Sequence, residues 1–435
     1  MSIAPPSRST AASSEYSSSS SYGGPLAVVT TLFFMWGFLT CLNDILVPHL
    51  KPIFDLNYKE IMLIQFAFFG AYFLFSIPSA KIIDWIGYQR SMVAGLLTMG
   101  LGAFLFVPAA SVPSYPLFLI ALIVLAAGIT CLQVAANPYV TVLGNPQTAS
   151  SRLNLTQAFN SLGTFLAPFF GGLLILSSAP KSMDEIRAMA PDALQAYRLH
   201  EAATVKAPYV GLGIALVVLA AAIGSFKLPK IPQAQHKVGE KVDDSIWRHP
   251  NLVFGAIGIF VYVGAEVAIG SFLVNYFTQP EIGGLTEKVA ASLVAFYWGG
   301  AMVGRFIGSG LLQKMKAGHL LAICSVCAAA LVAISMLSTG HFAMWSIILV
   351  GFFNSIMFPS IFALGVAELG PLTGDGSGIM IMAIVGGAII PLAQGAIADR
   401  IGIHHAFFLP VLCYLYILYF ALSGSKPNSE RHAQG

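Results

Sequence analysis

Twelve apolar stretches follow one another along this chain of 435 residues. A helix needs about 20 mostly apolar residues to cross the hydrocarbon core of a bilayer. Only 9% of the residues are charged and 57% are hydrophobic, whereas soluble domains carry about 25% charged residues. The pattern predicts an all-α integral membrane protein whose twelve transmembrane helices cover residues 25–50, 60–84, 91–111, 115–142, 153–178, 207–226, 252–277, 287–311, 318–338, 342–369, 374–399 and 405–424.

The segments outside these stretches divide the chain. Residues 1–24 are rich in serine and lack the basic and apolar regions of a signal peptide, so we expect a disordered tail. Residues 227–250 carry five lysines and arginines, and are predicted to link two six-helix halves at 25–226 and 251–424. Residues 425–435 form a second tail. An even number of crossings places both termini on one side, and the distribution of lysine and arginine predicts that this side, with the linker, is cytoplasmic.

The two halves repeat weak sequence features in the same order. Gly37 can be superposed on Gly264, and Gly70 on Gly300. Gly163 stands five positions before a proline, as Gly386 does in the second half. Together these matches suggest two parallel six-helix repeats, an arrangement that places a binding site at the repeat interface near the middle of the membrane.

Asp44 is an acidic residue in the middle of the apolar stretch 25–50. A carboxylate at membrane depth costs at least about 2.5 kcal/mol, so it usually faces a protein interior or a water-filled path. Asp44 therefore indicates a path for a cation, a polar solute or both. Glu266 is a second acidic residue at comparable depth in the second half.

Several local motifs resemble one known family. The loop with Asp84, Gly87 and Arg90 is a near match to the Gly-x-x-x-Asp-x-x-Gly-x-x-Arg loop of the major facilitator superfamily, with Ala80 in place of the first glycine. The runs LNDIL at 42–46, AANP at 135–138 and RLNL at 152–155 are similar to fucose–proton symporters, and VYVGAEVAIG at 261–270 and FFNSIMFP at 352–359 to bacterial glucose/galactose transporters. The resemblance covers residues 25–424.

The resemblance implies a cation-coupled sugar symporter of the bacterial inner membrane. Fucose symporters have a glutamate on the fourth helix where this chain has Gln133, whereas Glu266 stands where the glucose/galactose type has an acid. We therefore expect the coupling ion to be handled by Asp44, by Glu266 or by both. The sequence permits either sodium or a proton, and implies no other cofactor. The resemblance also places Asp84, Gly87 and Arg90 on the inner face, where they hold the two halves together.

A neutral monosaccharide presents hydroxyl groups that both donate and accept hydrogen bonds. Amides and a carboxylate can satisfy them, and the candidates in the first half are Asn43, Asp44, Gln65, Gln133, Asn137, Gln157 and Asn160. Aromatic residues of the second half can cover the faces of the sugar ring, and the candidates are Phe296, Tyr297, Trp298 and Phe362. The alternative for any single amide is a hydrogen bond between helices, worth about 0.6 kcal/mol in membrane bundles.

Other classes of function find less support. The chain has no His-Glu-x-x-His, Gly-x-Ser-x-Gly or Walker motif, so we expect neither an enzyme nor an ATP-driven pump. A net charge of +3 is too small to suggest nucleic acid, no metal site is predicted, and no obligatory protein partner is evident. The alternatives that remain are a symporter for fucose or an amino sugar, an uncoupled uniporter, and a channel or sugar receptor that does not accumulate its ligand. The preferred hexose, the stoichiometry and the oligomeric state stay open.

Overall fold

The computed structural model describes the backbone of residues 22–54, 58–111, 114–175, 185, 188–229 and 245–426. It describes the side chains of the same residues except those of 42–54, 58–62, 65, 169–175, 198 and 201–205. Nearly all of the first tail, most of the linker and most of the second tail lie outside the described residues.

The described residues of the first half form six long helices close to the predicted positions. They are α1 (Gly23–Phe54), α2 (Tyr58–Ile86), α3 (Tyr88–Ser111), α4 (Tyr115–Val142), α5 (Ala149–Ile175) and α7 (Pro191–Ser225), with a short 3₁₀ turn η1 (Pro146–Thr148) before α5. Gly87 separates α2 from α3 with φ of 83°, a backbone conformation that glycine adopts without strain. Pro191 is the first residue of α7. The backbone N–H at this position has no partner within a helix, so a proline, which lacks the N–H, fits there without losing a hydrogen bond.

The second half is more broken. Its helices are α8 (Pro250–Phe277), α9 (Glu287–Leu311), α10 (Ala317–Leu337), α11 (Gly340–Asn354), α12 (Met357–Gly365), α13 (Thr373–Met382), α14 (Gly386–Ile401), α15 (Ile403–Ala406) and α16 (Phe408–Tyr419), with short turns η2 (Ile246–Arg248), η3 (Gly370–Leu372), η4 (Ala383–Val385) and the π-helical turn η5 (Phe420–Gly424). The predicted spans 342–369 and 374–399 are thus each divided into two helices.

Eleven helical stretches among the described residues are long and apolar enough to cross a membrane. The predicted fifth span, α5, is not one of these: its described side chains end at residue 168, which leaves out its apolar C-terminal part, and the remainder carries Arg152, Asn154, Gln157 and Asn160. Its polar side chains lie against other helices, as described below. Helix α7 starts at Pro191, well before the predicted residue 207, and so includes a polar segment continuous with the sixth span.

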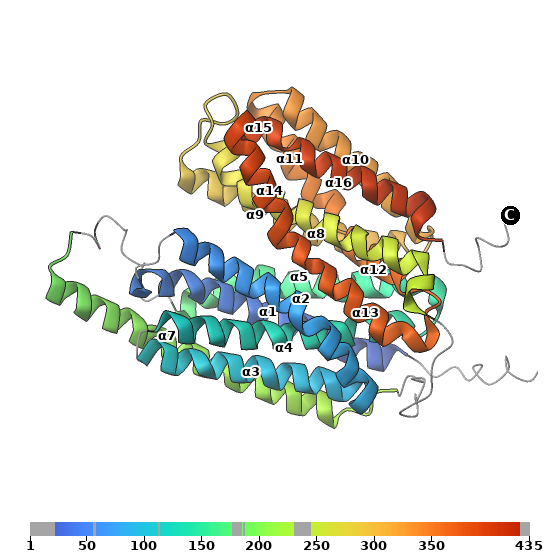
Figure 1. Ribbon diagram of the computed structural model, residues 1–435, viewed down its shortest axis with the longest axis horizontal. Helices are drawn as coiled ribbons and strands as arrows, with labels where there is room; N and C mark the ends of the chain where they lie inside the picture. The colour runs from blue at the N-terminus through green and yellow to red at the C-terminus, as the bar shows by residue number, and fades with distance from the viewer. Residues whose placement is uncertain are drawn as a thin grey trace, which may run out of the picture.

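The helices are arranged as two bundles (Figure 1). Helices α1 to α5 and α7 form one bundle, coloured blue to green, and α8 to α16 form the other, coloured yellow to red. Within the bundles α3 packs on α4 and α7, and α8 packs on α14 and α16. Between them α2 and α4 contact α13, and α5 contacts α9 and α12.

Polar contacts join the two bundles at one end of the molecule. Lys81 Nζ lies 2.8 Å from Asp375 Oδ1, and Ser151 donates a hydrogen bond of 2.8 Å to the backbone oxygen of Ser309. Lys81 lies near the end of α2, and Ser151 near the start of α5. We call this end, where α2, α4 and α9 finish and α5 and α13 begin, the contact end.

Candidate functional site

A cluster of amides lies in the first bundle, on the facing sides of α4 and α5. Gln133 donates a hydrogen bond of 2.7 Å to the hydroxyl of Tyr72 on α2. Gln157 donates to the side-chain oxygen of Asn137 at 3.5 Å, and Asn160 donates to the backbone oxygen of Phe33 on α1 at 2.9 Å. Residues four apart share one face of a helix, which explains why Gln133 and Asn137 lie together.

The amide cluster is not fully satisfied. The side chain of Asn137 is fully buried, and its Nδ2 atom has no hydrogen-bond partner among the described residues. An unpaired buried amide donor costs about 1–3 kcal/mol. The cluster therefore has a free donor for a polar ligand or for water.

Three further candidates of the first half cannot be placed at atomic level. Asn43 and Asp44 belong to α1 and Gln65 to α2, but their side chains lie outside the described residues. The contact of α1 with α5 brings the helix that carries Asp44 to the helix that carries Gln157 and Asn160. The roles of Asn43, Asp44 and Gln65 stay predictions.

Glu266 lies in a hydrogen-bonded network within the second bundle. The Tyr262 hydroxyl lies 2.9 Å from Glu266 Oε1 and 3.1 Å from the backbone oxygen of Asn354, and its single hydrogen serves one of them at a time. Asn354 donates to the Tyr297 hydroxyl at 2.9 Å and accepts from the Tyr414 hydroxyl at 2.8 Å. The Tyr297 hydroxyl in turn lies 3.4 Å from the backbone oxygen of Glu266. Helices α8, α9, α11 and α16 thus meet around this carboxylate.

Sequence reasoning did not assign a role to Tyr72, Tyr262, Asn354 or Tyr414. All four side chains are buried. A buried tyrosine in an apolar helix usually pairs its hydroxyl, so tyrosines within predicted spans were a usable signal. Their partners lie on other helices, and the sequence alone does not identify them.

The four aromatic candidates do not form one wall. Phe296, Tyr297 and Trp298 are consecutive on α9 and therefore point in three directions about 100° apart. Tyr297 joins the Glu266 network, whereas Phe296 is 57% exposed and packs edge-on against Trp345 with ring centroids 5.9 Å apart. Trp298 is 44% exposed beside Gly270 of α8, and Phe362 is fully buried and stacked on Phe358. Their contact with a sugar stays a prediction.

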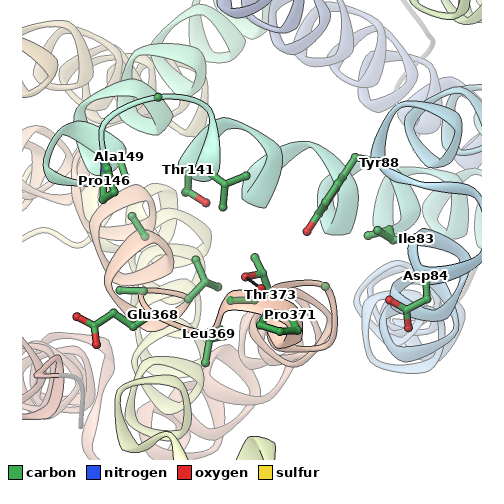
Figure 2. Close-up of a pocket in the computed structure, with 17 residues that line it drawn as sticks. Ile83, Asp84, Tyr88, Thr141, Pro146, Ala149, Glu368, Leu369, Pro371 and Thr373 are labelled. Carbon is green, nitrogen blue, oxygen red and sulfur yellow. Dashed lines mark hydrogen bonds between the residues drawn. The ribbon is translucent and has the colours of Figure 1, made fainter. Parts of the chain in front are cut away.

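The predicted inner-face loop lies at the contact end. Asp84 and the neighbouring Tyr88 line a cavity of about 670 Å³ between the two bundles, together with Thr141 of α4 and Glu368 beyond α12. In Figure 2 the Tyr88 ring points into this cavity, and Asp84 and Glu368 lie on opposite sides of it. Arg90 is exposed. Gln133, Asn137, Gln157 and Asn160 are not among the residues that line the cavity.

No group of three or more histidine, cysteine, aspartate or glutamate side chains that could hold a metal occurs in the part of the chain that the structure describes. The five cysteines are free. Among the described side chains, the amide cluster offers hydrogen bonding by amides and hydroxyls, and the Glu266 network adds a carboxylate.

Comparison with known proteins adds the family. Residues 26–390 match the Major Facilitator Superfamily. The chain is 53% identical over 413 residues to the glucose/galactose transporter of Brucella abortus, covering 95% of this chain and 97% of that protein. It is 36% identical over 404 residues to the L-fucose–proton symporter of Escherichia coli, covering 91% of this chain and 92% of that protein.

Solved structures agree with the sequence matches. A crystal structure of the E. coli fucose–proton symporter superposes with a TM-score of 0.87 at 35% identity, covering 93% of this chain and all of that one. A structure of the same transporter in the outward conformation superposes with a TM-score of 0.86. The chain belongs to the Major Facilitator Superfamily and, within it, to the group that contains the bacterial glucose/galactose transporters and the fucose–proton symporters.

Proposed function

We propose that this chain is a secondary transporter that imports a neutral hexose, glucose or galactose, together with a cation. The observation that carries the proposal is the 53% identity, across almost the whole of both chains, to a protein named as a glucose/galactose transporter. The amide cluster on α4 and α5 supplies the donors and acceptors that an uncharged sugar needs. We assign sugar binding to Gln133, Asn137, Gln157 and Asn160, with Asp44, Asn43 and Gln65 on the neighbouring helices.

Transport follows from rocking of the two halves. We assign the halves to residues 25–226 and 251–424, which meet at the contact end through Lys81, Asp375, Ser151 and Ser309. The similarity to a transporter in the outward conformation supports access to the sugar site from the opposite end in this state. Separation of the halves at the contact end would then release the sugar on the other side.

The contact end faces the cytoplasm in this proposal. The predicted orientation puts both termini and the linker 227–250 on the inner side of a bacterial inner membrane. The contact end includes the finish of α2 and the start of α5, which the same orientation places inside. Lipid surrounds the helices, and the proposal needs no protein partner and no cofactor besides the coupling ion.

Uptake of labelled glucose into proteoliposomes of the purified protein tests this function. An inward sodium gradient at equal pH is compared with an acid-outside gradient that lacks sodium. Accumulation under one gradient identifies the ion, and equilibration without accumulation under both would indicate a uniporter. If glucose and galactose do not enter but fucose or an amino sugar does, the substrate is another neutral sugar. Specific sugar binding without transport would instead favour a receptor.

The coupling role of the two deep carboxylates has its own test. We expect Asp44→Asn or Glu266→Gln to abolish gradient-driven accumulation, because an amide cannot bind a proton and holds sodium more weakly than a carboxylate does. Sugar exchange at equal concentrations, measured in the same vesicles, should persist in a variant that has lost coupling alone. Glu287→Gln, an exposed acid at the start of α9, is the matched control. Continued accumulation in both single variants would remove the ion-coupling role from these residues.

A further inference from the structure

Arg305 lies on α9 where the two bundles meet, and its side chain contacts both of them. One nitrogen of its guanidinium, Nη1, donates to the hydroxyl of Ser161 on α5 of the first bundle. Its Nε atom donates to the backbone oxygen of Ser355 in the second bundle at 3.3 Å. A planar guanidinium with several donors is suited to holding two acceptors at once. Arg305 is therefore a polar bridge between the halves.

The acceptor at Ser355 is available because of Pro359. In an α-helix the carbonyl of each residue accepts from the N–H four positions later, and proline has no N–H. Ser355 lies in the break between α11 and α12, so its carbonyl lacks this helical partner. The Nε–H of Arg305 supplies the missing hydrogen bond.

The break between α11 and α12 is also connected to Glu266 through Tyr262. The backbone oxygen of Asn354, adjacent to that of Ser355, lies 3.1 Å from the Tyr262 hydroxyl, which lies 2.9 Å from Glu266 Oε1. The positive charge of Arg305 also acts electrostatically on Glu266. A short polar path thus runs from Glu266 through Tyr262 and the helix break to Arg305.

The residues around Arg305 form part of the contact between the two halves. Asn154 of α5 donates to the backbone oxygen of Arg305 at 2.7 Å, and one turn later Ser309 accepts from Ser151. The helices approach closely here, since a β-carbon added to Gly308 would lie 3.2 Å from the Asn154 side chain. Separation of α5 from α9 would break the contact of Arg305 with Ser161.

We propose that Arg305 is a positioning residue that links the charge on Glu266 to the contact between the two halves. The proposal rests on the ion-coupling role assigned to Glu266 above. A partly buried guanidinium is stabilised by a nearby carboxylate. When a cation or proton neutralises Glu266, this stabilisation is lost, and Arg305 turns toward water and releases Ser161. The loaded transporter then opens at the contact end.

A cysteine reporter at the contact end tests the link. Ser151→Cys, in a chain whose five native cysteines are replaced by alanine, is buried until the halves separate. Its rate of reaction with a water-soluble maleimide is measured in detergent solution, without sugar. We expect Arg305→Gln to raise this rate about tenfold, the effect of losing one charge-assisted hydrogen bond. Ser161→Ala, which leaves the arginine in place, should raise it as well, and Lys314→Gln, an exposed charge on the turn after α9, should not.

A double-variant comparison separates a link from independent effects. Glu266→Gln should raise the labelling rate in the chain that retains Arg305 and should add nothing in the Arg305→Gln chain. Additive effects of the two substitutions, or an unchanged rate in Arg305→Gln and Ser161→Ala, would overturn the proposal. Because labelling requires neither sugar nor a gradient, this result is independent of the uptake test. Intact accumulation in Arg305→Gln would likewise overturn the link and leave the transport function standing.

Discussion

Asn354 lies where the hydroxyl groups of three tyrosines meet in the second bundle. Its amide donates to the Tyr297 hydroxyl and accepts from the Tyr414 hydroxyl, and its backbone oxygen receives Tyr262. The side chain is fully buried. One residue therefore fixes the hydroxyl groups of three tyrosines on three other helices around Glu266.

Replacing Asn354 should be costly. Asn354→Ala leaves the Tyr414 hydroxyl buried without its acceptor, at about 1–3 kcal/mol, and removes the donor to the Tyr297 hydroxyl, which keeps its contact with the backbone oxygen of Glu266. We expect a clearly lower midpoint of thermal unfolding for the purified protein in detergent. Ser292→Ala, which removes an exposed hydroxyl bonded only within α9, is the control. An unchanged midpoint in Asn354→Ala would mean that water replaces the amide.

For individual residues, the sequence identified polar side chains within the helices better than it identified their hydrogen-bond partners. Gln133 and Asn137 were both named as candidates, and they lie near each other because their spacing of four places them on one helix face. The pairing of Gln133 with Tyr72, and of Asn354 with Tyr414, depends on how separate helices pack. The same dependence explains why Phe296 and Tyr297, adjacent in sequence, have opposite environments.

Among the helices, α9 shows how close packing depends on individual glycines. A β-carbon added to Gly304 would lie 2.5 Å from the backbone oxygen of Phe352 on α11 and 2.5 Å from Ser355 Oγ. One added to Gly299 on the same helix would meet nothing within 4 Å. The two glycines lie on the same helix but have different surroundings.

This difference gives a matched pair of substitutions. We expect Gly304→Ala to destabilise the protein by about 1–3 kcal/mol, because α9 and α11 must move apart. Gly299→Ala should leave stability unchanged or raise it slightly, since alanine favours helix. Thermal unfolding of both variants in detergent measures the effect. Equal midpoints for the two would show that the close approach of α9 to α11 does not limit stability.

The sequence predicted the number and order of the crossings, and its errors have physical reasons. Hydropathy located α5 although its first half is polar, but could not show that neighbouring helices satisfy those side chains. The breaks at residues 355–356 and 383–385 lie inside continuously apolar segments, where hydropathy gives no boundary. Helix α7 extends beyond its predicted start because a polar segment can continue a helix outside the membrane.

For the whole molecule, the ion pair of Lys81 with Asp375 joins α2 to α13 across the two bundles. The side chains are 50% and 32% exposed, so the pair contributes at most about 1 kcal/mol. That amount is small for folding. It is enough to change the ratio of two access states about fivefold.

Asp375→Asn should therefore raise the labelling of the Ser151→Cys reporter about fivefold in low salt. Added salt screens exposed charges, so the difference from the parent chain should shrink as ionic strength rises. Asp399→Asn is the control, because Asp399 is an exposed acid near the C-terminal end of α14. A rise that is the same at all salt concentrations would argue that Asp375 acts by packing and not by charge.

Helix α7 has a practical consequence. Its 35 residues measure about 52 Å, and the hydrocarbon core of a bilayer is about 30 Å thick. About four turns of continuous helix therefore stand outside the hydrocarbon. A soluble protein fused to these turns in helical register would project rigidly from the detergent micelle, and would give electron cryomicroscopy the asymmetric feature needed to align images of a transporter that is otherwise hidden in detergent.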